Sequence, residues 1–289
     1  MIMADEHRRG DQTSSFSAAE KLPDTSRADR NAIDQQSRPS AALIHETIRA
    51  EGESELERTV PALLLSGLAA GLTMGFSLVA EGLLQAQLPD APWRGLVAHL
   101  GYTVGFLIVV LGRQQLFTEN TLTPILPLLY HRDGATFGRV ARLWGAVLVA
   151  NVVATWMFAA VIAHTELFTP EAKAAFLEIS RKSIAHPFAT TLLKAVFAGW
   201  LIALMVWLLP AAETARPVVI IIVTYVVALG EFAHIVAGSV DAAYLVSTGA
   251  ASLGDYAWKF FVPTLIGNVI GGVTLVAALN YGQVKPEIE

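Results

Sequence analysis

The chain of 289 residues lacks cysteine and is poor in charged residues. The absence of cysteine excludes a disulfide framework, a thiolate nucleophile and a cysteine-ligated metal. Charged residues make up only 16% of the chain and hydrophobic residues 54%, whereas soluble domains carry about 25% charged residues. Residues 1–58 alone hold 8 of the Lys and Arg and 12 of the Asp and Glu. The remainder has too few charges to cover a soluble surface, which predicts a membrane protein with a polar N-terminal extension.

Several classes of site are also missing. The sequence contains no H-E-x-x-H, no Gly-x-Ser-x-Gly and no cluster of metal ligands. We therefore expect that the protein is not an enzyme and that it binds neither a metal nor a cofactor. It has no G-x-x-x-x-G-K-[ST] loop, which disfavours transport driven by ATP. The net charge of −5 argues against a nucleic-acid partner.

The charge distribution predicts four regions. Residues 1–40 are polar, lack a signal-peptide core, and are expected to be a disordered cytoplasmic tail. Residues 41–58 have helical spacing of apolar side chains and many acids, which predicts an amphipathic cytoplasmic helix. Residues 59–283 form the predicted membrane domain, and residues 284–289 a C-terminal tail.

The membrane domain is expected to be all-α and surrounded by lipid, with six transmembrane helices. A crossing needs about 20 apolar residues. Six stretches are near or above that length: 59–84, 95–130, 140–164, 188–211, 217–250 and 258–281.

The second and fifth stretches are too long for one straight helix, and each is interrupted by polar residues. The interruptions are GRQQLFTEN, from Gly112 to Asn120, and GEFAHIVAGS, from Gly230 to Ser239. Non-helical backbone at membrane depth is tolerated only where it is buried in protein or lines a cavity. Two broken helices at corresponding positions therefore predict a transport site.

The two halves of the membrane domain also resemble each other. Asn151 and Asn268 each stand among small residues in the third stretch of a half, directly after the interrupted one. Three crossings per half is an odd number, so two such halves lie in opposite orientations. We therefore predict two inverted three-helix repeats, with chance similarity of two small-residue helices as the alternative.

The basic residues predict the orientation. With both termini in the cytoplasm, the inside regions hold 13 Lys and Arg and the outside loops hold 5. Such an excess of positive charge is typical of the cytoplasmic side. A multi-pass protein with cytoplasmic N- and C-termini is expected.

Three features together resemble the formate/nitrite transporter family. They are the run Leu116-Phe117-Thr118, the isolated His234, and the run from Ile266 to Gly272. The resemblance covers residues 45–283 or so. It implies an aquaporin-like protomer fold, a homopentamer with a pore in each protomer, and a bacterial-type inner (plasma) membrane. It also implies transport of a small monovalent anion, such as formate or nitrite, or of its acid.

The resemblance carries functional residues over to this sequence. His234 matches the central pore histidine and Thr118 the loop threonine. The expected apolar pore-lining residues are Leu116 and Phe117 at the cytoplasmic constriction, Tyr102 and Phe106 beside them, and Val227 at a second constriction. The sequence departs from the family at Gly238, Ala203 and Ala233, where polar residues are usual, and Lys182 is the nearest candidate for its outer lysine.

A histidine between apolar constrictions offers two ways to move an anion through a dry pore. As a cation it attracts the anion, and as a proton donor it lets the substrate cross as a neutral acid. Histidine suits both roles because both protonation states are accessible near neutral pH. Thr118 is expected to hold the imidazole or the substrate by its hydroxyl. The alternative is that His234 only bonds across helices.

Three charged residues lie in or beside the two interruptions: Arg113, Glu119 and Glu231. Charges at membrane depth are costly when unpaired and are functional candidates. We expect Arg113 to pair with Glu231 or Glu119 and so to tie the two interruptions together. In the alternative, an acid near the pore disfavours anions and changes selectivity.

Two other functions remain open on these residues. One is an aquaporin-like channel for another small solute, against which counts the absence of paired Asn-Pro-Ala motifs. The other is a non-conducting membrane scaffold that binds partners through its long N-terminal tail.

Overall fold

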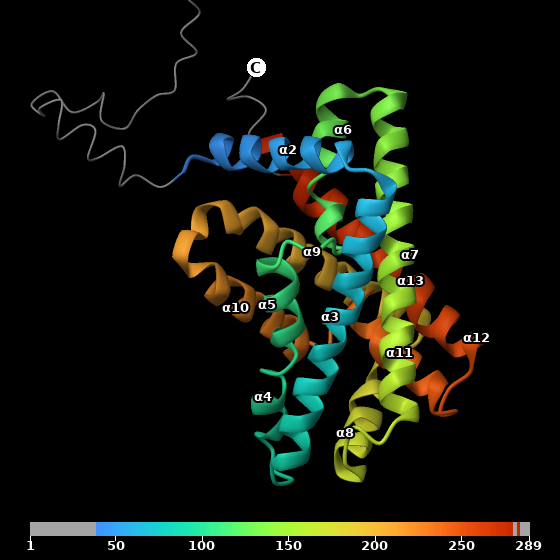
Figure 1. Cartoon of the computed structure of the whole chain (residues 1–289). Helices are drawn as coiled ribbons and strands as arrows, with labels where there is room; N and C mark the ends of the chain where they lie inside the picture. Colours follow the sequence, from blue (N-terminus) through green and yellow to red (C-terminus); the bar gives the residue numbers. More distant parts are fainter. Residues whose placement is uncertain (1–38, 280–281, 284–289) are drawn as a thin grey trace, which may run out of the picture. The chain divides into compact units, whose positions relative to one another are not determined.

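A computed structural model describes residues 39–279 and 282–283, and those residues form helices and loops without a strand. From Ala41 onward they belong to one compact unit (Figure 1). Of the two predicted tails, only residues 39 and 40 belong to the described part of the chain. The end of the sixth apolar stretch lies partly outside them too.

The helix α2 (Ala41–Glu57) lies across one end of the bundle, beside α6 (Ile125–His131) (Figure 1). Its buried residues are spaced three or four apart, which puts them on one helix face: His45, Ile48, Gly52 and Leu56. A methyl group on Gly52 would collide with the Thr123 carbonyl oxygen. Glycine therefore permits the close approach between α2 and the segment before α6.

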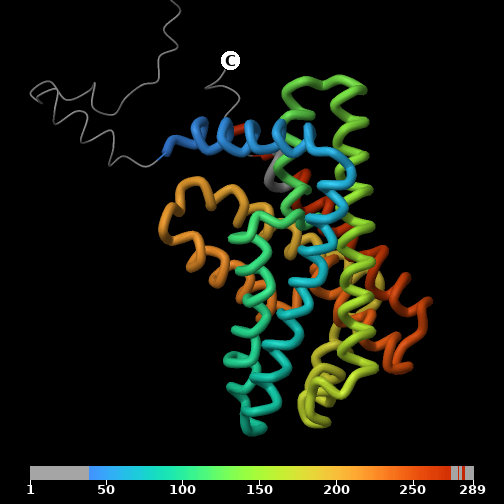
Figure 2. Tube along the Cα trace, in the orientation of Figure 1, coloured from blue at the N-terminus to red at the C-terminus, as the bar shows by residue number. Residues whose placement is uncertain are grey.

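The helices α3 (Val60–Gln87) and α7 (Gly134–His164) pack against each other along much of their length (Figure 2). Glycines at four-residue spacing make this approach possible, because a Cβ on Gly71 would meet the Asn151 backbone and one on Gly75 would meet the Phe158 ring. The helix α7 begins at Asp133, whose carboxylate accepts a 2.8 Å hydrogen bond from the Thr136 backbone N–H.

The first interruption separates helices that are close in sequence. In chain order the elements are α4 (Arg94–Ala98), α5 (Thr103–Leu111), the 3₁₀ turn η2 (Glu119–Thr121) and α6. After α7 the chain forms α8 (Pro170–Arg181) and η3 (Lys182–Ile184), and then enters its second half. Its elements are α9 (Phe188–Ala212), η4 (Glu213–Ala215), α10 (Arg216–Leu229), α11 (Ala237–Ser247), α12 (Leu253–Asp255), π-helical η5 (Tyr256–Phe261), α13 (Val262–Val269) and π-helical η6 (Ile270–Ala278).

Helix composition agrees with a membrane environment. Four helical stretches among the described residues are long and apolar enough to cross a bilayer: Val60–Gln87, Arg94–Leu111, Gly134–His164 and Phe188–Leu229. Large apolar side chains on the outer faces are exposed, including Leu65, Phe137, Val149, Met157, Leu193 and Ile222. Lipid rather than water suits such a surface. The fifth and sixth predicted stretches do not stand out by themselves, because α10 is continuous with α9 through η4 and the last stretch contains π-helical turns.

The chain leaves the helix in the same way at both interruptions. Arg113 follows α5 with φ of 50°, and Glu231 follows α10 with φ of 48°. The next residues fold back onto the helix end, as Gln114 N–H donates to Val109 O and Phe232 N–H donates to Val227 O, both at 3.0 Å. A positive φ is unfavourable for residues other than glycine, and it persists where surrounding contacts enforce it.

Candidate functional site

Two buried asparagines hold the non-helical segments. Asn151 on α7 accepts a 2.9 Å hydrogen bond from Phe117 N–H, and its amide donates to Gly67 O and Gln115 O at 2.8 and 2.9 Å. The bonds to Phe117 and Gln115 satisfy backbone groups outside the helical ladder, as burial requires, and the bond to Gly67 ties the asparagine to α3.

The second interruption repeats this arrangement with Asn268 on α13. Its side chain accepts a 2.8 Å hydrogen bond from Ile235 N–H and donates to Ala195 O and Ala233 O at 2.8 and 2.9 Å. A Cβ on Gly199 would meet the Asn268 backbone, just as one on Gly71 would meet Asn151. Each interruption is thus held by one asparagine through three equivalent bonds.

The interruptions meet where Thr118 contacts His234. The Thr118 hydroxyl lies 2.7 Å from the His234 Nε2, and the Ala237 backbone N–H donates to the His234 Nδ1 at 3.1 Å. Because Nδ1 accepts, the proton of the neutral ring is on Nε2, which donates to Thr118. A doubly protonated ring would set two N–H groups against each other at Nδ1. The geometry therefore favours a neutral imidazole.

Aromatic residues of the first half enclose this imidazole. The Phe106 ring meets the His234 ring edge-on, with centroids 4.9 Å apart, and Tyr102 lies 5.3 Å from Phe106. Phe106 and Thr118 are fully buried, and His234 is 1% exposed. The predicted residues Tyr102, Phe106, Thr118 and His234 are thus brought together, although they come from distant parts of the chain.

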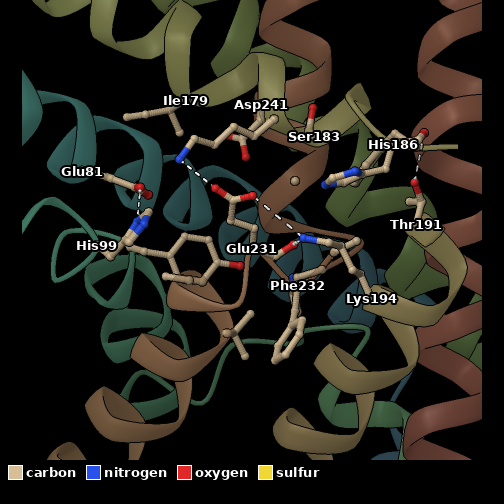
Figure 3. Close-up of a pocket in the computed structure, with 18 residues that line it drawn as sticks. Glu81, His99, Ile179, Ser183, His186, Thr191, Lys194, Glu231, Phe232 and Asp241 are labelled. Atoms are coloured by element: carbon tan, nitrogen blue, oxygen red, sulfur yellow. Dashed lines mark hydrogen bonds and ion pairs between the residues drawn. The ribbon is translucent and has the colours of Figure 1, made fainter. Parts of the chain in front are cut away.

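One pocket ends at this imidazole, and we call it the histidine pocket. Its lining includes Tyr102, Lys182, Lys194, Val227, Glu231 and His234. Figure 3 shows Glu231 near its centre, with ion-pair contacts to the surrounding side chains. Val227 is the predicted second-constriction residue, and it does lie on the pocket wall beside His234.

A second pocket lies beneath α2, and we call it the α2 pocket. Its lining includes Glu51, Glu55, Arg113, Gln115 and Glu119. Glu119 directly follows Thr118, so one hydrogen bond and one peptide link connect the linings of the two pockets.

The two residues predicted for the cytoplasmic constriction, Leu116 and Phe117, lie outside both pocket linings. Leu116 is fully buried and Phe117 is 1% exposed. The Phe117 ring packs edge-on against Trp144 of α7, with centroids 5.8 Å apart. Both residues lie in the chain segment between Gln115 of the α2 pocket and Thr118, the hydrogen-bond partner of His234.

The expected pairing of Arg113 with Glu231 or Glu119 is wrong. Arg113 pairs with Glu51 of α2, and Glu231 pairs with Lys182 at 2.9 Å. The physical reason is that each interruption opens at a different end of the bundle, where a peripheral helix supplies a nearer partner. Glu119 is half-buried, and its inaccessible Oε1 has no hydrogen-bond partner among the described residues.

Sequence reasoning missed the acidic contacts of α2. Glu55 accepts hydrogen bonds from the Thr123 hydroxyl at 2.7 Å and from the Gln115 amide at 3.1 Å. Burial raises the pKa of the Glu55 carboxyl, and the neighbouring Glu51 adds to the effect. The position of Glu55 one residue before the buried Leu56 gave no signal of these contacts, because they require α2 to fold back over the interruption.

Two further carboxylates line the histidine pocket. Glu81 of α3 lies 2.7 Å from the His99 Nδ1, and Asp241 follows His234 by two helical turns. Both are acids within apolar stretches of the sequence, and an ionisable residue in such a stretch is a functional candidate. Within residues 39–279 and 282–283, no group of three His, Asp or Glu side chains is placed to hold a metal ion.

An apolar helical fold in which a buried histidine closes a pocket is that of a membrane transport protein. The model of the formate/nitrite transporter family matches residues 42–282. The chain belongs to this family, which consists of channels and transporters of small anions rather than enzymes.

Known relatives agree with this assignment. The inner membrane protein YfdC of Escherichia coli is 44% identical over 257 residues, which are 89% of this chain and 83% of the relative. The formate channel BtFdhC of Bacillus thuringiensis is 28% identical over 242 residues, which are 81% of this chain and 91% of the relative.

Solved structures share the fold at low sequence identity. A pentameric formate channel with formate bound matches with a TM-score of 0.67 and 18% identity, covering 78% of this chain and 98% of the channel. An ion channel of the same family matches with a TM-score of 0.73 and 16% identity, covering 83% and 98%.

Proposed function

We propose that each protomer conducts a small monovalent anion such as formate or nitrite, or its acid, past His234. The observation that carries this proposal is the hydrogen-bonded pair of Thr118 and His234 at the closed end of the histidine pocket. Formate and nitrite are the right chemical class because each is small enough for a narrow pore and can accept both hydrogen bonds that the pair offers.

The chemical problem is desolvation. An isolated anion loses a large solvation energy in an apolar layer, whereas a neutral acid or a hydrogen-bonded anion loses much less. His234 contributes its Nε2 proton as a hydrogen-bond donor, and the Thr118 hydroxyl stands beside it. The substrate that reaches this layer replaces the Thr118–His234 bond with bonds of its own. A neutral imidazole donates a hydrogen bond but does not transfer that proton to the substrate. A proton that crosses with the substrate therefore comes from the entrance pocket.

We further propose six crossings in two inverted three-helix repeats, with the second and fifth helices broken. Support comes from the matching bonds of Asn151 and Asn268 and from the equal backbone turns at Arg113 and Glu231. In this arrangement residues 59–283 form the transport domain, with α2 on its cytoplasmic side. The tails 1–40 and 284–289 are then cytoplasmic as well.

Assembly and placement follow the same proposal. A homopentamer in the inner (plasma) membrane is favoured by the fold that this chain shares with a pentameric channel and by its inner-membrane relative. The exposed apolar faces of the helices would contact lipid or neighbouring protomers. The basic residues favour cytoplasmic termini.

The test is flux into proteoliposomes that contain the purified protein. Formate, nitrite, lactate and hydrosulfide are offered separately, each with and without an inward proton gradient. Wild-type protein is expected to carry at least formate or nitrite, faster with the gradient, and His234→Asn is expected to lose most of this flux. Equal flux and equal pH dependence in wild type and His234→Asn would contradict the role of His234. Flux of water or glycerol without any anion flux would instead favour the aquaporin-like alternative.

A further inference from the structure

The histidine pocket contains a carboxylate bound between two lysines. The Glu231 carboxylate lies 2.9 Å from the Lys182 Nζ and 3.9 Å from the Lys194 Nζ. The three residues come from different segments. Glu231 lies in the turn after α10, Lys182 in η3 and Lys194 in α9. All three line the pocket that ends at His234 (Figure 3).

We propose that Glu231 is a built-in competitor of the transported anion and that it sets the apparent affinity of the entrance. This inference rests on the proposed function. The Glu231 side chain ends in a carboxylate, which is the same chemical group as formate and resembles the bent, two-oxygen nitrite ion. An anion entering the pocket meets Lys182 and Lys194 with this group already bound to them.

The geometry makes the carboxylate displaceable. The Glu231 side chain is 40% exposed and that of Lys182 is 45% exposed, so water already solvates this ion pair in part. Exposed ion pairs contribute little, because water solvates the separated charges well. A tethered group nevertheless competes strongly, because its local concentration is in the millimolar range or above.

Lys194 is held in place independently of the carboxylate. Its ammonium donates hydrogen bonds to the backbone oxygens of Gly230 and Glu231, both at 3.3 Å. When the Glu231 side chain swings away, Lys194 therefore stays at the turn and can take the incoming anion. Lys182 has no such backbone anchor among its described contacts and is the cation that the substrate gains.

The remaining acids of the pocket behave differently. Glu81 lies against His99 at 2.7 Å, and Asp241 forms no ion pair within 4.0 Å with a described residue. Asp241 is thus an acid of the same pocket that does not occupy the lysines. Asp241→Asn therefore separates loss of the carboxylate bound to the lysines from loss of another carboxyl group of the same pocket.

The experiment compares formate uptake into proteoliposomes by wild type, Glu231→Gln and Asp241→Asn. Glutamine keeps the size and the backbone preference of glutamate, so the turn at residue 231 is retained. Glu231→Gln is expected to lower the apparent KM for formate about threefold to fivefold, as befits the loss of one partly exposed ion pair. Asp241→Asn is expected to change the KM by a smaller factor. An unchanged or increased KM in Glu231→Gln, or an equal decrease in both variants, would overturn the inference.

Two additions keep the outcome interpretable. In a Lys182→Gln background, Glu231→Gln is expected to have less effect on the KM, because the contested cation is gone. Glu166 lies in the loop before α8, outside the pocket lining, and its carboxylate is 3.7 Å from the Lys173 ammonium. Glu166→Gln therefore controls for the removal of a negative charge alone. A full effect of Glu231→Gln in the Lys182→Gln background would also contradict the inference.

Failure of the proposed function would be seen separately. If wild type carries no formate or nitrite, the transport proposal fails. The formate concentration that half-maximally raises the melting temperature is then compared between wild type and Glu231→Gln in detergent. A lower half-maximal concentration in the variant supports the competition, and the same or a higher value contradicts it.

Discussion

Thr118 and His234 are 116 residues apart in the chain, yet the threonine hydroxyl lies 2.7 Å from the imidazole Nε2. Because Ala237 N–H donates to the other ring nitrogen, the hydrogen-bond direction at Nε2 is fixed from the ring to the hydroxyl. The Thr118 hydroxyl proton then remains for a substrate oxygen.

Replacing the hydroxyl by a methyl group is expected to impair transport more than folding. Thr118→Val keeps the shape of the side chain but leaves the Nε2–H without its acceptor, at a cost of about 1–3 kcal/mol for an unpaired buried donor. Formate flux in proteoliposomes is expected to fall by roughly tenfold. Thr118→Ser restores the hydroxyl and is expected to recover most of the flux. Full flux in Thr118→Val would show that the hydroxyl takes no part in transport.

The two asparagines are expected to contribute similarly to stability. Asn151→Ala leaves the Phe117 N–H and the Gln115 carbonyl without this partner, and Asn268→Ala leaves the Ile235 N–H and the Ala233 carbonyl without theirs. Each loss costs about 1–3 kcal/mol per unsatisfied group. Both variants are expected to melt at clearly lower temperatures in detergent.

Thr165→Ala is a suitable control for these variants, since its hydroxyl only donates to Val161 O in an exposed position. Its melting temperature is expected to match that of wild type. A large effect of one asparagine and none of the other would argue against equivalent interruptions.

The contact between α2 and the segment before α6 is expected to tolerate no methyl group at Gly52. Alanine favours an isolated helix over glycine by about 1 kcal/mol, but here its Cβ would meet the Thr123 carbonyl. Overpacking of this kind costs about 1–3 kcal/mol. Gly52→Ala is expected to increase proteolytic cleavage of α2, whereas Ser54→Ala at an exposed position of α2 is not. Equal protection of both variants would show that α2 shifts without cost.

Docking of α2 is expected to weaken as the pH rises. Burial raises the pKa of Glu55 above its ordinary value, so the docked state binds a proton more readily than the undocked state. The stabilisation is complete below the ordinary pKa of a free glutamate, about 4.3, and is lost as the pH rises through the raised pKa. Amide hydrogen exchange in residues 41–57, corrected for the intrinsic rate, is expected to increase between pH 5 and pH 8.

Glu55→Gln should remove this dependence, because the amide keeps an oxygen for the Gln115 amide and carries no titratable proton. Glu57→Gln, at an exposed end of the same helix, is the matched control and should retain the dependence. A pH dependence of exchange that persists in Glu55→Gln would assign it to another group of the α2 pocket, whose other acids include Glu51 and Glu119.

The sequence predicted the helical class and the positions of both interruptions. Apolar stretches of membrane length interrupted by polar residues indicate where a helix stops, because polar backbone at that depth needs partners. Asn151 and Asn268 were found by their small-residue surroundings, since only small neighbours let an asparagine reach the backbone of an adjacent helix. His234 and Thr118 were proposed from family resemblance, and the roles of all the pore residues stay predictions.

The sequence failed on the charges. Arg113 was expected to pair with Glu231 or with Glu119, because these are the charged residues in or beside the two interruptions. Spacing along the chain does not tell that α2 lies beside one interruption and η3 beside the other. The partners Glu51 and Lys182 are supplied by these peripheral elements.

The sequence by itself determined that this chain is an apolar helical membrane protein with two interrupted segments, because hydropathy and helix-breaking residues act locally. Only the tertiary structure decided which charges pair, which imidazole nitrogen carries the proton, and which residues line the two pockets. The ion pairs of the interruptions and the bonds of the two asparagines depend on contacts between residues more than 30 positions apart, such as Glu231 with Lys182 and Ala195 with Asn268. Helix packing creates such contacts, and no local pattern records them.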